Sequence, residues 1–253
     1  PMILATDDSA GPDAPRVLYY GHYDVQPPEP FDEWNHPPFD AEIVDGPNGK
    51  RIVARGAADD KGQLMTFIEA IRAWKDTYES LPVRVVILLE GEEESGSESL
   101  VPFLHKHKDE LQADTCIVCD TGMWDPETPA ITSRLRGLVY IEATLHGPSH
   151  DLHSGSYGGA VVNPANALTE VLGQLHDEDG KIQIEGFYDD VEEVSAEQIT
   201  QWNSLGDADA LTLESSGSKA TFGEQGFSTL ERLWSRPTCD INGLRAGYQG
   251  EGA

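Results

Sequence analysis

The chain has 253 residues and is strongly acidic, with 17 Lys and Arg against 45 Asp and Glu and a formal net charge of −28. This charge excludes the broad basic surface that nucleic-acid binding needs, and it is equally unsuited to an anionic membrane. With 38% apolar residues and five Trp, the chain can fold around a sizeable core. We interpret most acidic residues as hydrated surface, as in salt-adapted proteins, with some serving a metal site, rather than as acidic disorder.

The first half of the chain is predicted to alternate strands and helices. A strand over 17–21 leads into a proline-rich loop over 27–38, and residues 41–54 form a hairpin around a Gly-Pro-Asn-Gly turn. The elements expected next are an amphipathic helix from Leu64 to Trp74, a buried strand over 83–89, a helix over 98–108 with Leu100, Val101 and Leu104 inward, and a strand over 115–119. This order is typical of an α/β domain with a largely parallel sheet.

The pattern changes near residue 136, where we place a boundary between a domain over 1–135 and an α+β domain over 136–253. The features expected beyond it are a one-sided strand over 139–145, a helix that begins at Pro164 after the N-cap Asn163, a helix opened by a capping box at Ser195, and a mobile, acidic Gly- and Ser-rich loop over 208–226.

Carboxylates and one histidine follow the predicted strands. Four Glu lie within 90–94, directly after the buried strand, and such crowded carboxylates need either open water or a shared cation. Taken alone, this run indicates a solvated turn. Similar polar groups end the other strands: His22, Asp24, Asp59, Asp60 and Asp120. Because parallel strands end at one edge of a sheet, we expect these groups to converge, which favours the cation.

This ligand set predicts the kind of metal. One neutral His with several carboxylates suits zinc, manganese or cobalt. Asp24, two residues after His22, is placed to hold the tautomer of that His. The carboxylates outnumber the needs of one ion, which predicts two divalent ions about 3.5–4 Å apart, bridged by an Asp, with one Glu left as general base.

Four ordered motifs resemble those of the carnosinase-type dipeptidases, members of the cocatalytic zinc peptidases that include aminoacylase and succinyl-diaminopimelate desuccinylase. They lie at 21–27 (Gly-His-Tyr-Asp-Val-Gln-Pro), 55–62 (Arg-Gly-Ala-Ala-Asp-Asp-Lys-Gly), 90–97 (Glu-Gly-Glu-Glu-Glu-Ser-Gly-Ser) and 151–155 (Asp-Leu-His-Ser-Gly). The segments 236–243 and 247–252 also look like that family's lid. The resemblance implies a catalytic metal-binding domain with an inserted lid and dimerisation domain, both incomplete in this chain.

The resemblance also implies a role for individual residues in the first domain. His22 would bind the first metal, with Asp24 behind it and Asp120 completing its ligands. Asp59 would bridge the two metals, with a cis peptide bond to Asp60. Asp at position 120, rather than Glu, resembles the peptidase branch of the family more than the desuccinylase branch.

The family's motif has a pair of Glu residues, whereas this chain has a run of three. The Ser-Gly-Ser that follows the run sets its alignment with the family's pair. This alignment makes Glu93 the general base, Glu94 a ligand of the second metal and Glu92 a bystander. In relatives, the His that matches His153 crosses a homodimer interface and stabilises the oxyanion in the partner's active site. The resemblance therefore implies a homodimer that uses a lid histidine in trans.

The resulting hypothesis is metal-dependent hydrolysis of a dipeptide-type bond in a small peptide. Two alternatives stay open: an N-acyl amino-acid deacylase, and a noncatalytic metal-binding or dimerisation homologue. Phosphate or nucleotide binding is disfavoured, since no Gly-x-Gly-x-x-Gly motif follows a strand. The family's last metal-binding His and its substrate-gripping lid Arg have no counterpart, which leaves Asp59 and Glu94 for the second metal. We therefore expect a fragment that is inactive or nearly so.

The cysteines and the ends of the sequence are the features from which we predict the cellular location. Cys116 and Cys119 lie three apart in a predicted strand and so point to opposite faces, which indicates two buried thiols in a reducing compartment. The sequence has no signal peptide and no apolar run long enough to span a bilayer. We therefore predict a cytoplasmic protein, although a start at Pro1 leaves room for an upstream targeting segment.

Overall fold

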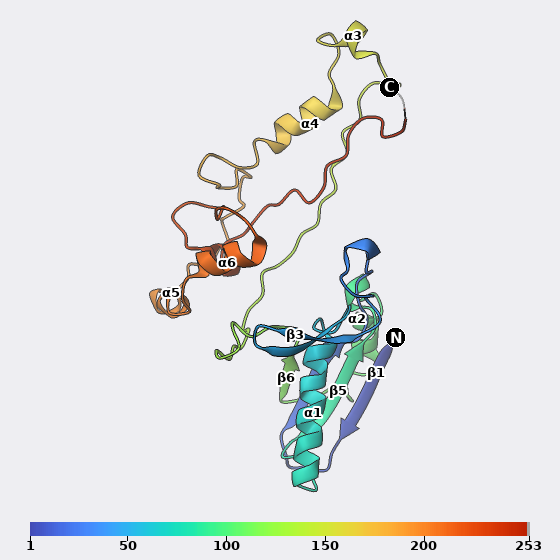
Figure 1. Cartoon of the computed structure of the whole chain (residues 1–253), viewed down its shortest axis with the longest axis vertical. Helices are drawn as coiled ribbons and strands as arrows, with labels where there is room; N and C mark the ends of the chain where they lie inside the picture. Colours follow the sequence, from blue (N-terminus) through green and yellow to red (C-terminus); the bar gives the residue numbers. More distant parts are fainter. Residues whose placement is uncertain (252–253) are drawn as a thin grey trace. The chain divides into compact units, whose positions relative to one another are not determined.

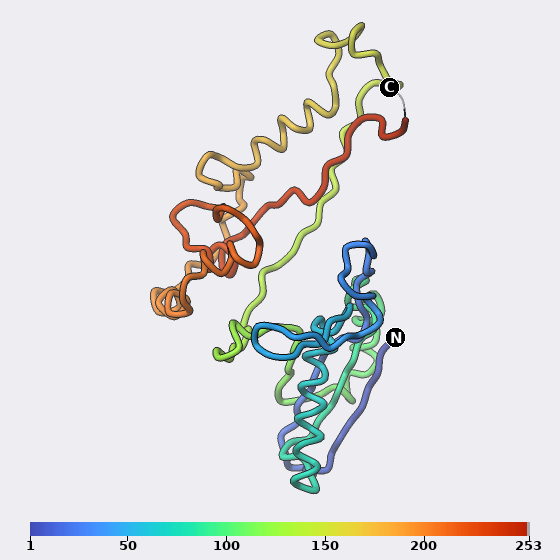
Figure 2. The backbone as a smooth tube through the Cα atoms, viewed as in Figure 1, coloured from blue at the N-terminus to red at the C-terminus, as the bar shows by residue number. Residues whose placement is uncertain are grey.

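The chain forms two compact units, Pro1–Thr132 and Ser133–Ala253, which are described separately. The computed structural model describes residues 1–251, and Figures 1 and 2 show the elements and the path of the backbone. The predicted domain boundary lies a few residues beyond the division between these units. That the two parts act as catalytic and lid domains stays a prediction.

The first unit is built on a four-stranded sheet in the order β1 (Met2–Asp7), β5 (Arg84–Glu90), β2 (Arg16–His22) and β6 (Thr115–Val118) (Figure 1). β2 is parallel to both β5 and β6, and β1 is antiparallel to β5. The prediction of a largely parallel sheet is confirmed. β1 is absent from the predicted elements, since its place at the sheet edge depends on pairing with a strand some eighty positions away.

Two helices pack on opposite faces of this sheet. On one face, α1 (Lys61–Thr77) lies against β2, where the Phe67 ring stacks on Tyr19 with centroids 4.0 Å apart, and Leu64 of the same helix is buried. Leu18 alternates with Tyr19 along β2 and joins the opposite face. The core there is Val86, Leu88 and Leu111, against which Leu100 and Phe103 of α2 (Leu100–Lys106) pack.

The inward face of α2 differs from the predicted one. Val101 is 59% exposed and Leu104 is 38% exposed, whereas Leu100 and Phe103 pack on the core. The helix is shorter than two turns, so it can bury only one narrow stripe. The stripe that contains Phe103 buries the larger apolar area, and the prediction for Val101 and Leu104 is wrong.

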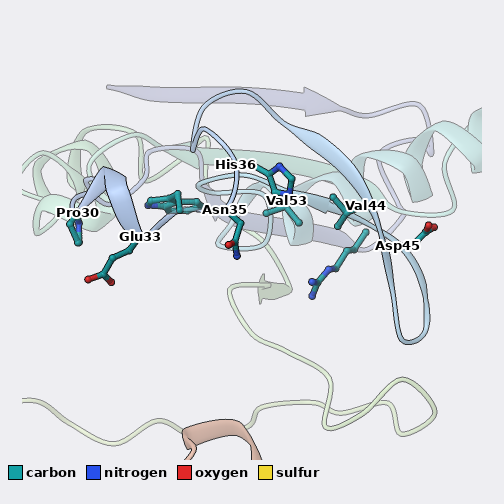
Figure 3. A pocket seen from close by; sticks show the side chains of 9 residues that line it. Pro30, Glu33, Asn35, His36, Val44, Asp45 and Val53 are labelled. Atoms are coloured by element: carbon teal, nitrogen blue, oxygen red, sulfur yellow. The ribbon is translucent and has the colours of Figure 1, made fainter.

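The predicted hairpin is confirmed as β3 (Glu42–Gly46) and β4 (Gly49–Val53), whose register pairs Gly46 with Gly49 across a two-residue turn. The proline-rich loop before it contains the short 3-10 helix η1 (Phe31–Glu33). The Trp34 indole donates to the Pro28 carbonyl at 2.7 Å. Loop and hairpin enclose an open pocket of about 550 Å³ (Figure 3), lined by Pro30, Glu33, Trp34, Asn35, His36, Val44, Asp45, Arg51 and Val53.

The described part of the second unit consists of short helices and connecting segments. The helices are α3 (Ser154–Tyr157), α4 (Pro164–Leu172), α5 (Ala196–Asn203), α6 (Ala208–Ser216) and α7 (Thr229–Trp234). Asn163 caps α4 by accepting from Ala165 N at 2.9 Å, as predicted. Ser195 caps α5 by accepting from Gln198 N at 3.2 Å, while the Gln198 side chain bonds to Gln201 and leaves the predicted capping box half formed.

Two predictions for the second unit are wrong. Residues 139–145 form no strand, because none of the described residues pairs with their backbone, and Val139 and Tyr140 are 82% and 80% exposed. The predicted mobile loop is the helix α6 over its first half. Asp207 caps this helix by accepting from Ala210 N at 3.0 Å, and Gly217 ends it in the left-handed conformation.

The second unit is held by a cluster of Arg236, Glu224, Tyr188 and Phe227, termed here the Arg236 cluster. The Arg236 guanidinium donates to both Glu224 oxygens, at 2.7 and 2.8 Å. It also lies 4.2 Å from the centroid of the Phe227 ring and 4.9 Å from that of Tyr188. A two-bond fork with ring stacking is a geometry that only arginine provides.

Arg236→Lys should therefore destabilise the second unit by about 1–2 kcal/mol, because lysine loses one of the two hydrogen bonds and the planar stacking. Hydrogen exchange of the α7 amides measures this loss. Arg134→Lys is the matched control, since its pair with Glu192 is 84% and 86% exposed. Equal exchange in the two variants would contradict a stabilising role for the Arg236 cluster.

In the first unit, Lys75 near the end of α1 donates to Asp7 at the end of β1. This bond, with others from Ser9, lowers the pKa of Asp7 to about 2. At a pH above 3.8, the ordinary pKa of Asp, the ionised Asp7 therefore stabilises the fold. This contribution to stability is lost as the pH falls towards 2. Because the pair is partly solvated, we expect at most about 1 kcal/mol.

Asp7→Asn should remove this part of the pH dependence. Urea unfolding at pH 5 and pH 2.5 would show a smaller loss of stability between the two pH values in the variant than in the unmodified chain. Asp8→Asn is the control, because Asp8 pairs with Arg84 while 56% exposed. A pH dependence that Asp7→Asn leaves unchanged would contradict the assignment.

Candidate metal centre

His22, the last residue of β2, lies at the middle of the predicted site and is fully buried. Its Nε2 atom is 2.9 Å from Asp59 Oδ1, 3.7 Å from Asp120 Oδ2 and 3.9 Å from Glu93 Oε2. These carboxylates come from three different segments, which follow β4, β5 and β6. The expected convergence at the carboxyl edge of the sheet is therefore present.

Asp24 holds the other side of the histidine ring. Its Oδ1 atom lies 3.3 Å from His22 Nδ1, and its backbone carbonyl lies 3.2 Å from the same nitrogen. Its carboxylate also accepts from the backbone N–H groups of Glu93 and Glu94, at 3.3 and 3.0 Å. One side chain thus orients the imidazole and anchors the acidic turn, and the spacing of the sequence motifs indicates only the first of these contacts.

The three Glu of the acidic turn point to different partners. Glu93 faces His22, and Glu94 Oε2 accepts from Gln26 Nε2 at 2.8 Å. Glu92 instead pairs with the N-terminal amine at 3.3 Å and accepts from Ser99 N at 3.1 Å. The turn is the 3-10 helix η2 (Glu93–Ser95), and it ends at Gly96 in the left-handed conformation.

Asp60 supports the histidine from behind. The Asp59–Asp60 peptide bond is cis, Asp60 is fully buried, and its Oδ2 atom accepts from His22 N at 3.1 Å. A Cβ atom on Gly21 would lie only 2.8 Å from that oxygen. Glycine at position 21 is therefore what allows the carboxylate to reach the backbone of β2.

The charge of the site is unbalanced. Burial raises the pKa of Glu93 and of Asp120, and neighbouring carboxylates raise both further. For His22, burial lowers the pKa, but Asp59, Asp120 and Glu93 together outweigh burial and leave the pKa raised. Clustered carboxylates with one imidazole lack positive charge, and a divalent cation would supply it.

Two overlapping groups of side chains could hold such a cation. One is His22, Asp59 and Glu94, the other is His22, Glu93 and Asp120, and within each group the ligand atoms lie within 4.8 Å of one another. A nitrogen with carboxylate oxygens suits zinc, manganese or cobalt, so the residues fit the predicted metals. The geometry does not separate ligand from base, since Glu93 belongs to the second group.

His153, the remaining predicted site residue, belongs to the second unit. It is exposed and occupies the N-cap position of α3. Its proposed role in a partner's active site stays a prediction. Of the cysteines, Cys116 is exposed on the edge strand β6, so the prediction of two buried thiols is wrong, and all three cysteines are unpaired.

The fold is α/β with a largely parallel sheet, and its His–carboxylate cluster is a candidate metal centre. Residues 18–235 match the model of Peptidase family M20/M25/M40, and the chain belongs to this family. It is 32% identical to Cys-Gly metallodipeptidase dug1 of Schizosaccharomyces pombe and 31% identical to Beta-Ala-His dipeptidase of Homo sapiens, with all of this chain aligned to 53% and 49% of those proteins. The chain thus spans about half the length of these curated relatives.

Solved structures agree with this assignment. An M20 family metallo-carboxypeptidase from Sulfolobus solfataricus is 34% identical with a TM-score of 0.76, and human carnosine dipeptidase 1 is 30% identical with a TM-score of 0.73. All of this chain is covered in both comparisons, with 56% and 53% of the solved chains. The resemblance to carnosinase-type dipeptidases is confirmed. Among the described helices, none is long and apolar enough to cross a membrane.

Gly21→Ala should weaken both the fold and metal binding, because the added methyl group would displace the Asp60 carboxylate from His22 N. We expect a loss of about 1–3 kcal/mol in stability, typical of overpacking a closed site. Thermal unfolding and a zinc titration measure the two effects. The matched control is Gly122→Ala, since a Cβ there meets nothing within 4 Å. Identical behaviour of the two variants would contradict the packing argument.

Proposed function

We propose that the whole protein is a metal-dependent dipeptidase that hydrolyses the peptide bond of small peptides. The observation that carries this proposal is the approach of Asp59, Asp120 and Glu93 to one buried nitrogen of His22 in a chain of this peptidase family. The names of its relatives, a Cys-Gly metallodipeptidase and a Beta-Ala-His dipeptidase, support the substrate class.

The residues that would hold the metal are His22, Asp59, Glu94 and Asp120. We propose two divalent ions, zinc with manganese or cobalt as alternatives, with Asp59 shared between them. When bound, such ions polarise the scissile carbonyl and lower the pKa of water so that it can act as a nucleophile. Asp24 fixes the tautomer of His22 through Nδ1, which leaves Nε2 free to face the carboxylates.

Glu93 is the proposed general base. It accepts the proton from the attacking water and returns it to the leaving amine as the tetrahedral intermediate collapses. The raised pKa of Glu93, caused first by burial, suits a group that must both take and release a proton. His153 of a second subunit is proposed to stabilise the oxyanion, which makes a homodimer the expected assembly.

The alternative activity, removal of an acyl group from an N-acyl amino acid, uses the same chemistry on a different acyl group, since the leaving group is the amine of an amino acid in both reactions. A panel of dipeptides and N-acyl amino acids distinguishes the two, and we expect dipeptides to be hydrolysed faster. Absence of hydrolysis in the metal-loaded protein would favour a noncatalytic homologue.

The three cysteines form no disulfide bond, which supports the proposed cytoplasmic location.

In the whole protein, Glu93→Gln should leave the metal content unchanged and lower kcat by about 10²–10⁴-fold, because the amide cannot accept the proton. Metal analysis and steady-state kinetics measure the two quantities. Glu92→Gln is the control, with the same change of charge one residue away and a side chain that accepts from Ser99 N instead of facing His22. Loss of metal in Glu93→Gln would instead make Glu93 a ligand, as in the group with His22 and Asp120.

A further inference from the structure

Glu90 is a buried acidic residue for which the proposed reaction has no use. It is the last residue of β5 and is fully buried. Its Oε2 atom accepts from the Tyr20 hydroxyl at 2.5 Å, while its Oε1 atom is buried with no hydrogen-bond partner in the described part of the chain. Buried carboxyl groups normally have a cationic partner or several donors, so this one requires an explanation.

The register of the sheet places Glu90 beside the metal centre. In the parallel pairing of β2 with β5, Glu90 lies opposite His22. Adjacent strands are about 4.8 Å apart, and side chains two positions apart share a face, so Tyr20 and His22 project to the same side of β2. The Glu90 carbonyl also accepts from Tyr23 N at 2.8 Å, which joins the strand ends just beyond His22.

Tyr20 lies close both to Glu90 and to two carboxylates of the candidate metal centre, Glu93 and Asp120. Its hydroxyl donates to Glu90 Oε2 at 2.5 Å, and the carboxylates of Glu93 and Asp120 interact electrostatically with the same ring. This hydrogen bond brings no positive charge to Glu90, and no Lys or Arg of the described residues forms an ion pair with it. A cation bound at His22 would supply positive charge to the part of the sheet that contains this carboxylate.

We propose that Glu90 is a positioning residue of the metal centre, held beneath His22 by Tyr20, whose negative charge strengthens cation binding without contacting the ion. This inference rests on the proposed metal site. Charges act over several ångströms where water is excluded, so a carboxylate behind the ligands attracts the cation. Residues behind metal ligands commonly change metal affinity by about 10–100-fold when they are replaced.

The test is a titration of the metal-free 253-residue chain with Zn²⁺ in a calorimeter. Glu90→Gln keeps the size of the side chain and an acceptor for Tyr20 but removes the charge, and it should raise the Kd for Zn²⁺ about tenfold. Tyr20→Phe should weaken binding less, since the charge is kept but released from its position. Glu92→Gln is the matched control and should bind as the unmodified chain does.

Thermal unfolding of the metal-free variants separates positioning from structure. We expect Glu90→Gln to unfold near the temperature of the unmodified chain, and Glu90→Asp, which restores the charge, to recover part of the affinity. Equal Zn²⁺ affinity in Glu90→Gln and Glu92→Gln would overturn the inference. If Glu90→Gln does not fold, Tyr20→Phe decides, and unchanged affinity in that variant overturns it.

Failure of the proposed metal site gives a different result. If the site is correct, the unmodified chain binds Zn²⁺ and His22→Ala abolishes that binding. If the unmodified chain binds no Zn²⁺, or if His22→Ala binds it equally well, the metal site itself is wrong and the role of Glu90 falls with it. Binding that depends on His22 but not on Glu90 refutes only the further inference.

Discussion

The first unit depends on a concentration of negative charge around one buried imidazole. The parallel strands β2, β5 and β6 bring their carboxyl ends to a common edge, where Glu93 and Asp120 approach His22, and the segment after the β3–β4 hairpin adds Asp59. Repulsion among carboxylates opposes this arrangement, so the fold has to enforce it. The same repulsion favours the binding of a divalent cation, which would neutralise part of the negative charge. The site where the carboxylates repel one another is therefore also the proposed metal site.

Several contacts enforce the arrangement from outside the ligand set. Asp60 accepts from the backbone of His22, and Gly21 leaves the space for that carboxylate. Asp24 accepts from both Glu93 N and Glu94 N while facing the imidazole. These are mostly hydrogen bonds from the backbone to a carboxylate, which fix the position of the acidic side chain without adding a competing cation.

The second unit is stabilised differently. Its helices are short and largely exposed, and the Arg236 cluster with its two-bond ion pair joins segments that bury little apolar surface. The exposed apolar run around Val139 and Tyr140 has the composition of a strand but no partner among the described residues. Local composition favours an extended backbone, and only a neighbouring strand can make it part of a sheet.

The sequence by itself determined the elements whose signals are local. The turn between β3 and β4, the N-cap at Asn163 and the amphipathic α1 each depend on residues within a few positions, and all three are formed. The motifs also determined which side chains would meet, because strand ends must share an edge. The resemblance added their expected chemical roles, which experiments must now assign.

Tertiary structure alone decided features that depend on distant partners. β1 exists because β5 offers it an edge, and α2 turns Phe103 rather than Val101 inward because of the sheet beneath it. The second contact of Asp24 and the burial of Glu90 against Tyr20 also join residues about seventy positions apart. Sequence spacing carries no information on such contacts, because they arise from the packing of separate segments.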